Sequence, residues 1–498
     1  MLPLMTSQRS QRLLEVLPGV FIMVTTAAAV ALAVVSPRLA VTVIVLFDLY
    51  WLFRMYYLLL HVLSAWGAYR RSLRVDWATR LEQAAPDRWR QIWHLVILPT
   101  HGEPYAVVAR TLESLRHSRY SCDRMLVVLA GEARDGAAFL EVARQAKTQF
   151  GSSFARFEVT VHPDGLPHEI AGKGSNLRFA GLAARRFIDE LQLPYDRVIV
   201  SSFDVDTCPH PQYFALLTLT YLREPRPARA SYQPIAMYTN NVWASHPLVR
   251  VVAGTTTFWL LTDLARAERL FTFSSHSMSL AALVDVDFWD PGIVTEDSRI
   301  FLQCLEHYGG DYRVVPIFLP VSMNTVDVGD WLRSLVNQYR QIRRWAWSVE
   351  HFPWMAQRFF GRSGRRSFPL AVRVRYFWNL MEGMYSWVTA PLLIFLFSRA
   401  ALALARSEGS VFLERAGAAL GLMANLGLAG LVIFAVLYWT MLPQKEMARW
   451  WDYPLLALQW ALTPLTLVVW GSLPALEAQL RLMLGGRFRL GFDVTEKV

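Results

Sequence analysis

Residues 197–206 read Arg-Val-Ile-Val-Ser-Ser-Phe-Asp-Val-Asp, an apolar run that ends in two aspartates separated by one valine. The run Arg197–Phe203 predicts a buried β-strand, because strands covered on both faces are continuously apolar. Asp204 and Asp206 follow where this strand ends. Carboxylates at alternate positions can both reach one cation, and their hard oxygens suit Mg²⁺ or Mn²⁺. The stretch therefore predicts a metal site, able to hold a diphosphate, at the edge of a sheet.

Upstream of this stretch, short apolar runs alternate with amphipathic segments. Strands are predicted over Ile92–Leu98, Met125–Ala130 and Phe157–Val161, and helices over Glu103–His117, Asp135–Phe150 and Ser175–Leu191. The alternation predicts an α/β domain with a largely parallel sheet that binds ligands at the carboxyl ends of its strands. No GxGxxG follows the first strand, which argues against a dinucleotide-binding domain.

Polar side chains follow the first two predicted strands as well. They are Thr100, His101 and Glu103 after the first strand, and Glu132 and Asp135 after the second. We expect them to converge with Asp204 on one crevice, as a nucleotide site requires. Ordinary helix capping by Thr100 and Asp135 is the alternative interpretation. Capping does not account for two aspartates directly after an apolar strand.

A second acidic motif, Thr295-Glu296-Asp297, precedes a helix predicted over Ser298–His307. Asp297 is the candidate general base, which would take a proton from an acceptor hydroxyl. Glu296 is a competing assignment for the same role. Thr295 has the simpler interpretation of a helix N-cap.

The helix predicted over Trp331–Val349 has two distinct faces. An apolar stripe suited to a membrane surface is formed by Leu332, Leu335, Val336, Tyr339, Ile342, Ala346 and Val349. Gln341, Arg344 and Trp345 share another face, because positions three and four apart are neighbours on a helix. This face offers an indole for a sugar ring and a guanidinium for a phosphate. A basic surface helix with an interfacial tryptophan is the alternative interpretation.

The chain is 54% hydrophobic, and its apolar residues gather in long runs. Runs of membrane-spanning character are Val16–Val35, Leu39–Leu63, Tyr376–Phe397, Ala418–Leu442 and Pro454–Val469, with no comparable run between Trp66 and about Phe368. They predict an N-terminal transmembrane hairpin over residues 1–66, a cytosolic domain over 67–330, an interfacial helical region over 331–368, transmembrane or re-entrant helices over 369–484, and a tail over 485–498. A cleaved signal peptide at Val16–Val35 is less consistent with the second run that follows it closely.

Charge and cysteine content place the domain inside the cell. The net charge of +10 comes largely from basic clusters beside the apolar runs, which indicates contact with lipid headgroups and no nucleic-acid partner. The clusters predict a cytoplasmic N-terminus and domain by the positive-inside rule. Cys122, Cys208 and Cys304 lack zinc-site spacing, and free thiols fit the cytoplasm.

The ordered set of DxD, TED, QxxRW and the late Phe492-Asp-Val-Thr-Glu-Lys497 resembles the membrane-integrated family 2 glycosyltransferases. That group includes the bacterial cellulose synthase catalytic subunit, hyaluronan synthase and chitin synthase. The resemblance covers roughly Leu95–Lys497, and QxxRW after TED is its most specific part. It implies an inverting GT-A domain, a nucleotide-sugar donor and a divalent cation.

The resemblance also implies a role for individual residues. Asp204 and Asp206 would bind the donor diphosphate and the metal, and Asp297 would be the base. The acceptor and diphosphate site would contain Gln341, Arg344 and Trp345, with Glu296 beside them. Lys173 would contact the donor, and Thr495 and Lys497 would lie in a tail that closes over the nucleotide. Two positions depart from the family pattern. Glu132 stands where relatives carry aspartates that bind uridine, so the pattern supports a nucleoside diphosphate more strongly than UDP in particular. His276, in the loop Phe273–Ser277, either contacts the acceptor or bonds to the loop backbone.

The membrane half poses a question of topology. A single crossing by Pro454–Val469 would leave the tail outside the cell, away from any nucleotide sugar. Because Pro464 and Pro474 interrupt this region, we expect a broken hairpin or an interfacial re-entrant helix. Asp48, Arg54 and Glu382 are costly within membrane spans, and they line a conduit or satisfy one another.

These observations predict a hexosyltransferase of a bacterial-type inner membrane that extends a polysaccharide processively from a nucleotide sugar, with UDP as the expected nucleotide, and couples extension to export. The alternative acceptor is a membrane lipid, as in ceramide glucosyltransferase. A transporter or scaffold with a degenerate domain is disfavoured by the intact motifs. The sequence names no sugar, linkage or partner subunit.

Overall fold

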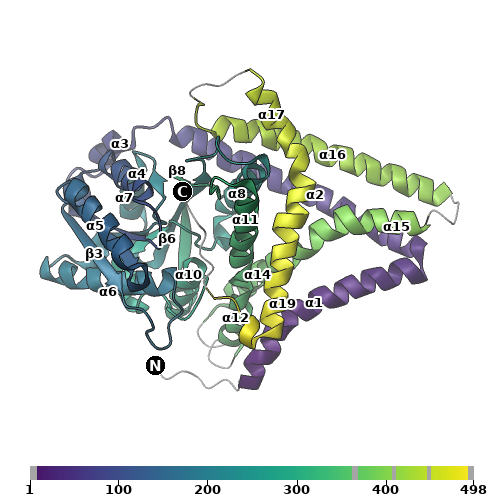
Figure 1. Ribbon diagram of the computed structural model, residues 1–498, viewed down its shortest axis with the longest axis horizontal. Helices are drawn as coiled ribbons and strands as arrows, with labels where there is room; N and C mark the ends of the chain where they lie inside the picture. The colour runs from purple at the N-terminus through teal and green to yellow at the C-terminus, as the bar shows by residue number, and fades with distance from the viewer. Residues whose placement is uncertain (1–7, 362–367, 406–410, 446–449, 492–498) are drawn as a thin grey trace.

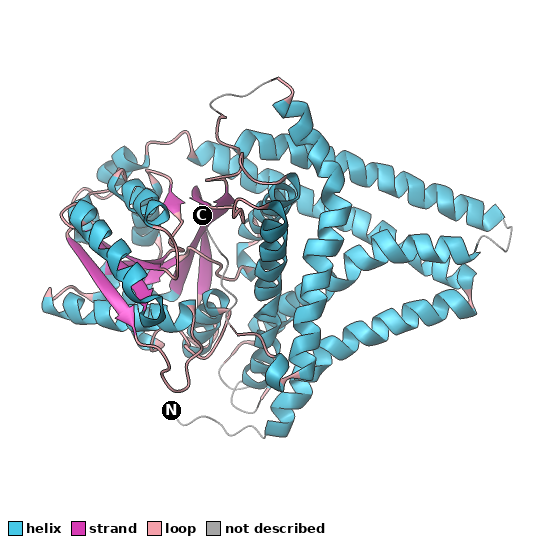
Figure 2. Cartoon of the chain, viewed as in Figure 1, coloured by secondary structure: helices cyan, strands magenta, loops and turns pink. Residues whose placement is uncertain are grey.

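The computed structural model describes residues 8–361, 368–405, 411–445 and 450–491. An α/β domain with one sheet lies at one end of the molecule, and long apolar helices extend from it (Figure 1). Figure 2 shows that the strands are confined to this domain. The N-terminal helices α1 (Gln8–Val35) and α2 (Pro37–Ser72) precede the domain in the chain, and the remaining long helices follow it.

In the part of the chain that the structure describes, the sheet has eight strands in the order β3-β2-β1-β4-β7-β6-β8-β5. The strands are β1 (Trp93–Pro99), β2 (Met125–Glu132), β3 (Arg156–His162), β4 (Val198–Ser202), β5 (Cys208–Pro209), β6 (Ala230–Tyr238), β7 (Ser277–Ser279) and β8 (Arg313–Met323). All four strands predicted from the sequence are confirmed, and they pair in parallel as β3-β2-β1-β4. The prediction of a largely parallel sheet is confirmed, because β6 and β8 also pair in parallel, while the short strands β7 and β5 run antiparallel to their neighbours. The sheet is therefore mixed.

Helices cover both faces of the sheet, and those near residues 105–116, 136–150, 173–190 and 296–307 correspond to the predicted helices. The covering helices are α3 (Trp77–Ala84), α4 (Tyr105–Arg116), α5 (Gly136–Phe150), α6 (Lys173–Glu190), α7 (Tyr213–Arg223), α9 (Leu280–Asp285) and α10 (Glu296–His307). The apolar side chains of β1, β2 and β4 are buried between these layers. Because parallel strands end at the same edge, the segments that follow β1, β2 and β4 meet at the carboxyl edge of the sheet.

An apolar helix within the domain was not predicted. Helix α8 (Pro247–Leu264) is mostly buried, and it packs on β6, on α2 and on the last apolar segment of the chain. A Cβ on Gly254 would lie 3.1 Å from Trp460 and 3.2 Å from Tyr438, so this glycine permits close packing between α8 and the apolar segments that contain these two residues. Threonines at 255–257 lower the apolar character of this helix below that of a span. The sequence pattern therefore did not indicate α8, the helix that joins the α/β domain to the long apolar helices.

The region predicted to be interfacial contains α11 (Trp331–Ala346), a 3-10 turn η7 (Trp347–Glu350) and α12 (His351–Phe360). The predicted apolar stripe is divided. Leu332 and Val336 are exposed, as a membrane-facing surface requires, whereas Ile342 and Ala346 are buried against protein. The α-helix ends before Val349, which also lies in the protein interior.

Within the described residues, five segments are long and apolar enough to cross a membrane: Arg9–Val35, Pro37–Ser72, Leu370–Leu404, Val411–Met441 and Pro454–Leu484. The third combines α14 (Leu370–Pro391), the π-helix η8 (Leu392–Phe397) and α15 (Ser398–Ala405), and the fourth is α16 (Val411–Met441). In Figure 1 the turn between α1 and α2 and the facing ends of α15 and α16 lie at the end of the molecule away from the sheet. The first four segments therefore form two hairpins that return to the domain.

The fifth segment lies differently. It is broken into α17 (Asp452–Leu458), the 3-10 turn η10 (Gln459–Leu462), α18 (Thr463–Leu467), the π-helix η11 (Val468–Ser472) and α19 (Leu473–Leu484). Helix α19 packs on α11 and α1, beside the domain (Figure 1). Trp470 Nε1 donates to the Leu335 carbonyl at 2.9 Å, and Glu477 accepts from Tyr339 and Arg343. The Arg12 guanidinium donates to the Leu482 carbonyl at 2.9 Å. The end of α19 thus lies beside the beginning of α1.

Two of the charged residues within the predicted spans form an ion pair. Arg54 on α2 and Glu382 on α14 are 2.5 Å apart, and Arg269 of the domain lies 3.8 Å from the same carboxylate. These contacts favour the interpretation that the charges satisfy one another. They do not point to a polar conduit at this position.

Candidate active site

One ammonium group and three carboxylates meet beside the carboxyl end of β4. Lys173 Nζ lies 2.8 Å from Asp204 Oδ1, 2.8 Å from Asp297 Oδ2 and 3.3 Å from Glu296 Oε1. The Lys173 side chain is 11% exposed, so these ion pairs are largely shielded from water. The structure therefore joins the two acidic motifs through a residue that only the family resemblance had indicated.

The first turns of two helices bring this cluster together. Lys173 begins α6, and Glu296 and Asp297 begin α10. Gly174 permits their approach, because a Cβ there would lie 3.1 Å from the Glu296 Cβ and 3.2 Å from the Asp290 carbonyl oxygen. Acidic side chains at a helix N-terminus are stabilised by the helix dipole, whereas a lysine there is not. The carboxylates offset that cost for Lys173.

Burial and ion pairing oppose each other in this cluster. Burial lowers the pKa of Lys173, but Asp204, Asp297 and Glu296 outweigh it and hold that pKa well above the ordinary value. Burial and the charge of Asp297 raise the pKa of Glu296, while Lys173 opposes them. Lys173 is therefore a permanent cation. Glu296 holds its proton more tightly than an ordinary carboxyl group, which makes Asp297 the better candidate for the base.

The two aspartates after β4 have different surroundings. The Ser274 hydroxyl donates to Asp204 Oδ2 at 2.7 Å, which orients the Asp204 carboxylate toward Lys173. Asp206 is only 2% exposed, and its Oδ2 accepts the Asn324 backbone N–H at 2.9 Å. One Asp206 oxygen is thus committed to holding the end of β8.

The loop that precedes β7 contacts both acidic motifs. Besides Ser274, it includes Thr272, whose hydroxyl donates to the Asp297 carbonyl oxygen at 2.5 Å. His276 Nδ1 lies 2.9 Å from the Phe273 carbonyl oxygen and 3.9 Å from Asp297 Oδ1. His276 is fully buried, and burial lowers its pKa although Asp297 opposes the shift. It therefore bonds to the loop backbone, and its burial leaves it out of reach of an acceptor.

Polar residues after β1 are engaged with one another. The Thr100 hydroxyl donates to Glu103 Oε2 at 2.8 Å, and the His101 backbone N–H donates to the same oxygen at 2.6 Å. His101 Nδ1 lies 2.6 Å from Asp135 Oδ1. Neither Thr100 nor Asp135 caps a helix, because Pro104 occupies the N-cap position of α4 and the Asp135 side chain makes no capping hydrogen bond to α5. These contacts join the loops after β1 and β2.

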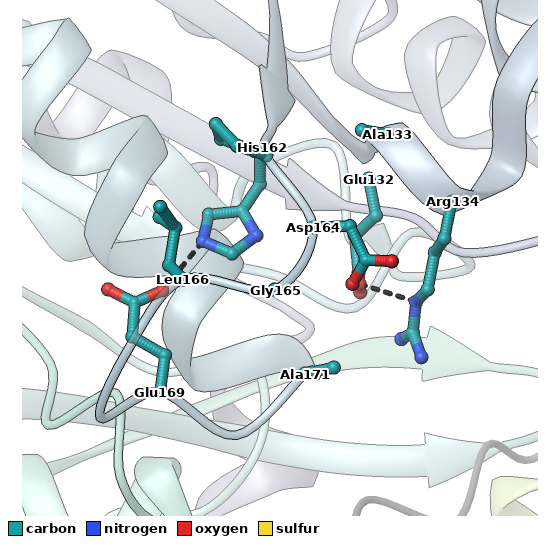
Figure 3. Close-up of a pocket in the computed structure, with 10 residues that line it drawn as sticks. Glu132, Ala133, Arg134, His162, Asp164, Gly165, Leu166, Glu169 and Ala171 are labelled. Carbon is teal, nitrogen blue, oxygen red and sulfur yellow. Dashed lines mark hydrogen bonds and ion pairs between the residues drawn. The ribbon is translucent and has the colours of Figure 1, made fainter.

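A cavity of about 90 Å³ opens at the ends of β2 and β3. Figure 3 shows Glu132 with Arg134 on one side of it and His162 with Glu169 on the other. Glu132 and Arg134 are 2.7 Å apart, and His162 Nε2 lies 2.8 Å from Glu169 Oε2. Ala171 also lines the cavity, two residues before Lys173. The cavity is therefore lined by residues close in sequence to Lys173, and it has hydrogen-bond acceptors and donors on both walls.

The Gln341, Arg344 and Trp345 face of α11 is turned toward the domain. Trp345 packs against Tyr238 with ring centroids 5.9 Å apart. Burial, then the charges of Asp204 and Asp206, raise the pKa of Tyr238, whereas Arg344 lowers it. Arg344 also acts against the raised pKa of Glu296. Gln341 is buried and accepts from the Gln338 amide at 3.0 Å. Arg344 and Trp345 thus border the carboxylate cluster, whereas Gln341 faces the protein interior.

Tyr238 is a residue of the site that sequence reasoning missed. It ends β6, a strand for which the sequence analysis predicted no element. An aromatic residue at the carboxyl end of the apolar run Ile235–Tyr238 was the available signal. Thr495 and Lys497, expected in the closing tail, lie outside the described residues.

The residues of the site supply only some of the oxygen ligands that a divalent cation requires. Among the described residues, no three His, Cys, Asp or Glu side chains are grouped as metal ligands. Asp204 presents a hard carboxylate at the rim of the cluster, but Lys173 already contacts it and Asp206 is committed on one oxygen. A cation held here would need most of its oxygen ligands from a bound diphosphate or water.

No protein-family model and no curated protein matches the chain. Among solved structures, a mannosyltransferase from Pyrobaculum calidifontis with GDP-Man and Mn²⁺ is 15% identical, with 82% of this chain and 99% of that chain covered and a TM-score of 0.43. TarS residues 1–349 from S. aureus with UDP-GlcNAc is 12% identical, with 62% and 88% covered and a TM-score of 0.34. Because these identities and TM-scores are low, we assign no donor, metal or acceptor from them.

Proposed function

We propose that the chain is an inverting membrane glycosyltransferase that transfers a sugar from a nucleoside diphosphate to an acceptor hydroxyl. The observation that carries this proposal is the cluster of Lys173 with Asp204, Glu296 and Asp297 beside Arg344 and Trp345. The proposal is supported by the proximity of an ammonium group, two acidic motifs and an aromatic pair, which would serve as cation, base and sugar platform. The order of the motifs in the sequence supports the same class of reaction.

In the proposed reaction, Asp297 accepts the proton of the acceptor hydroxyl as that oxygen bonds to the anomeric carbon. The bond between that carbon and the diphosphate oxygen breaks, and the nucleoside diphosphate leaves with the electron pair. Attack from the face opposite the leaving group inverts the configuration. Lys173 and Arg344 are the fixed positive charges that stabilise the departing diphosphate. The cavity beside Glu132 and His162 is the proposed site for the nucleoside, with Thr100, His101 and Glu103 along its approach.

A divalent cation, Mg²⁺ or Mn²⁺, is proposed at Asp204, where it would neutralise negative charge on the diphosphate. Asp206 contributes by holding the segment after β4 against Asn324. Lys173 supplies positive charge to the same place from within the chain. The proposal therefore predicts that donor binding depends on both Lys173 and the cation.

The proposed acceptor is a growing polysaccharide that contacts the α11 face containing Trp345. A lipid acceptor is the second candidate, and one observation favours it: Arg54 and Glu382 pair with each other, which removes one argument for a polar conduit. The two candidates differ in product size. Purified protein with radiolabelled nucleotide sugars should give a ladder of products of increasing length. A single glycolipid would replace the first candidate by the second, and no transfer from any nucleotide sugar would reject the proposed class.

We also propose that the catalytic domain and the end of α19 lie on the cytoplasmic side. In a variant without native cysteines, Arg38→Cys at the turn between α1 and α2 should react with a membrane-impermeant maleimide in intact cells. Leu140→Cys in the domain and Phe488→Cys after α19, which are 56% and 39% exposed, should react only after lysis. Reaction of Phe488→Cys in intact cells would contradict the interfacial placement of the fifth segment.

A further inference from the structure

Two consecutive residues at the start of α12 hold the turn that contains Asp297. Glu350 Oε1 accepts the Thr295 hydroxyl at 2.7 Å and the Thr295 backbone N–H at 3.3 Å. Its other oxygen accepts Trp347 Nε1 at 3.0 Å. Thr295 lies two residues before Asp297, and it makes no side-chain cap to its own helix. The predicted capping role of Thr295 is therefore replaced by a contact to another element.

His351 holds the other side of the same turn. Its Nε2 lies 2.7 Å from Ser298 Oγ and 3.2 Å from Thr295 Oγ1. His351 is 1% exposed, and burial with the charge of Arg299 lowers its pKa well below the ordinary value. The ring is thus neutral at physiological pH. Thr295 and Ser298 flank Glu296 and Asp297 in the sequence, so both ends of the acidic motif are attached to Glu350 and His351.

These attachments lie in an enclosed and polar environment. Arg299 is 5% exposed, and its guanidinium lies 4.7 Å from the Trp354 ring centroid. Burial raises the pKa of Glu350, although the Thr295 hydroxyl and Arg299 oppose that shift. Buried polar groups of this kind fix a single geometry, because any displacement leaves a donor or acceptor unsatisfied.

The attachments also connect two parts of the site. Trp347 and Glu350 belong to the 3-10 turn η7, which continues directly from α11 and its Arg344 and Trp345. A shift of α11 relative to the sheet would therefore be transmitted to Asp297 through Glu350 and His351.

We propose that Glu350 and His351 are positioning residues that fix the base Asp297 relative to the acceptor-side helix α11. This inference rests on the proposed function, in which Asp297 must lie within hydrogen-bond distance of an acceptor hydroxyl. Misplacement of a reacting group by about 1 Å can cost about 100-fold in rate. The pair acts through Thr295 and Ser298 and does not itself touch the reacting atoms.

The chain contains a matched control for mere packing between α10 and α12. Arg358 on α12 and Glu306 near the end of α10 form an ion pair of 2.7 Å. Both side chains are partly exposed, at 41% and 34%. This pair joins the same two helices at the end of α10 away from Asp297. Glu306→Ala therefore removes a contact between the helices without releasing the acidic motif.

The kinetic test compares Glu350→Ala and Thr295→Val, singly and together, with Thr295→Ser and Glu306→Ala. We expect each of the first two variants to lower kcat by about 100-fold with donor KM within about twofold, and the double variant to be no slower than either. Thr295→Ser, which keeps the hydroxyl, should restore most of the rate, and Glu306→Ala should stay near the unmodified rate. Additive losses, or an equal loss in Glu306→Ala, would overturn the positioning role.

Hydrogen exchange supplies a readout that needs no activity. In the full-length protein, Glu350→Ala should increase exchange at the amides of residues 295–299 and leave exchange in the last turn of α10 unchanged. Glu306→Ala should increase exchange in the last turn of α10 and leave exchange at residues 295–299 unchanged. Unchanged exchange at 295–299 in Glu350→Ala would overturn the inference. If the unmodified chain transfers no sugar, the proposed function fails, and the exchange result alone decides whether the turn is held as described.

Discussion

Asp297→Asn is expected to lower the rate of sugar transfer by about 10²–10⁴-fold, the range that general-base catalysis contributes. The amide has nearly the shape of the carboxylate, and its oxygen still accepts from Lys173, so the cluster should persist. Under the proposed function, what the variant lacks is the base that takes the proton of the acceptor hydroxyl. Donor affinity should therefore change much less than kcat.

Transfer is measured with a saturating labelled nucleotide sugar, and donor affinity by calorimetry. Asp287→Asn is the matched control, because Asp287 is 77% exposed and pairs with Arg178 outside the site. Its rate should match that of the unmodified chain. Substantial transfer by Asp297→Asn would assign the base to another residue, and Glu296→Gln is the next variant to examine.

Lys173→Met should weaken donor binding and destabilise the fold. Removal of one partner from a buried ion pair leaves uncompensated charge, at a cost of about 3–5 kcal/mol. Here three carboxylates lose their shared cation. Under the proposed function, the donor diphosphate would also lose a fixed positive charge beside Asp204. Thermal unfolding in detergent and donor binding should both show the effect, whereas Lys147→Met on the exposed face of α5 should show neither.

The loss of stability in Lys173→Met should depend on pH. The pKa of Glu296 is raised in the folded chain, and removal of Lys173 raises it further because that lysine opposes the shift. A carboxyl group with a raised folded pKa binds more protons in the folded state, so its contribution to stability falls as pH rises through that window. The variant should therefore be closer in stability to the unmodified chain at about pH 6 than at about pH 8. A larger loss at the lower pH would contradict the assignment of Glu296.

The sequence allowed the first half of the sheet to be predicted because each strand there is continuously apolar and is followed by a polar loop. It did not reveal β6, β7 and β8. Strand β7 has only three residues, and the pairing of these strands depends on contacts distant in the sequence. The reversed directions of β5 and β7 were not predictable for the same reason.

The candidate site was predictable where a motif lies at the end of an element. Asp204 after β4 and Asp297 at the start of α10 are such positions. Their connection through Lys173 was not predictable from spacing, because it depends on the close approach of Gly174 to the Glu296 turn. The attachment of Thr295 to Glu350 spans 55 residues, and no local pattern indicates it.

The contact between Arg12 and the Leu482 carbonyl joins residues 470 positions apart. Ribosomes add about 5–20 residues per second, so the first helix waits roughly half a minute to a minute and a half for this partner. During that interval Glu15, which is almost fully buried in the finished molecule and pairs with Arg489, lacks that partner. Arg489 is thus added after the residues of all eight described strands. Chains that stop before Arg489 would keep the Arg12–Glu15 ion pair but lack the second cation that this buried carboxylate has in the complete molecule.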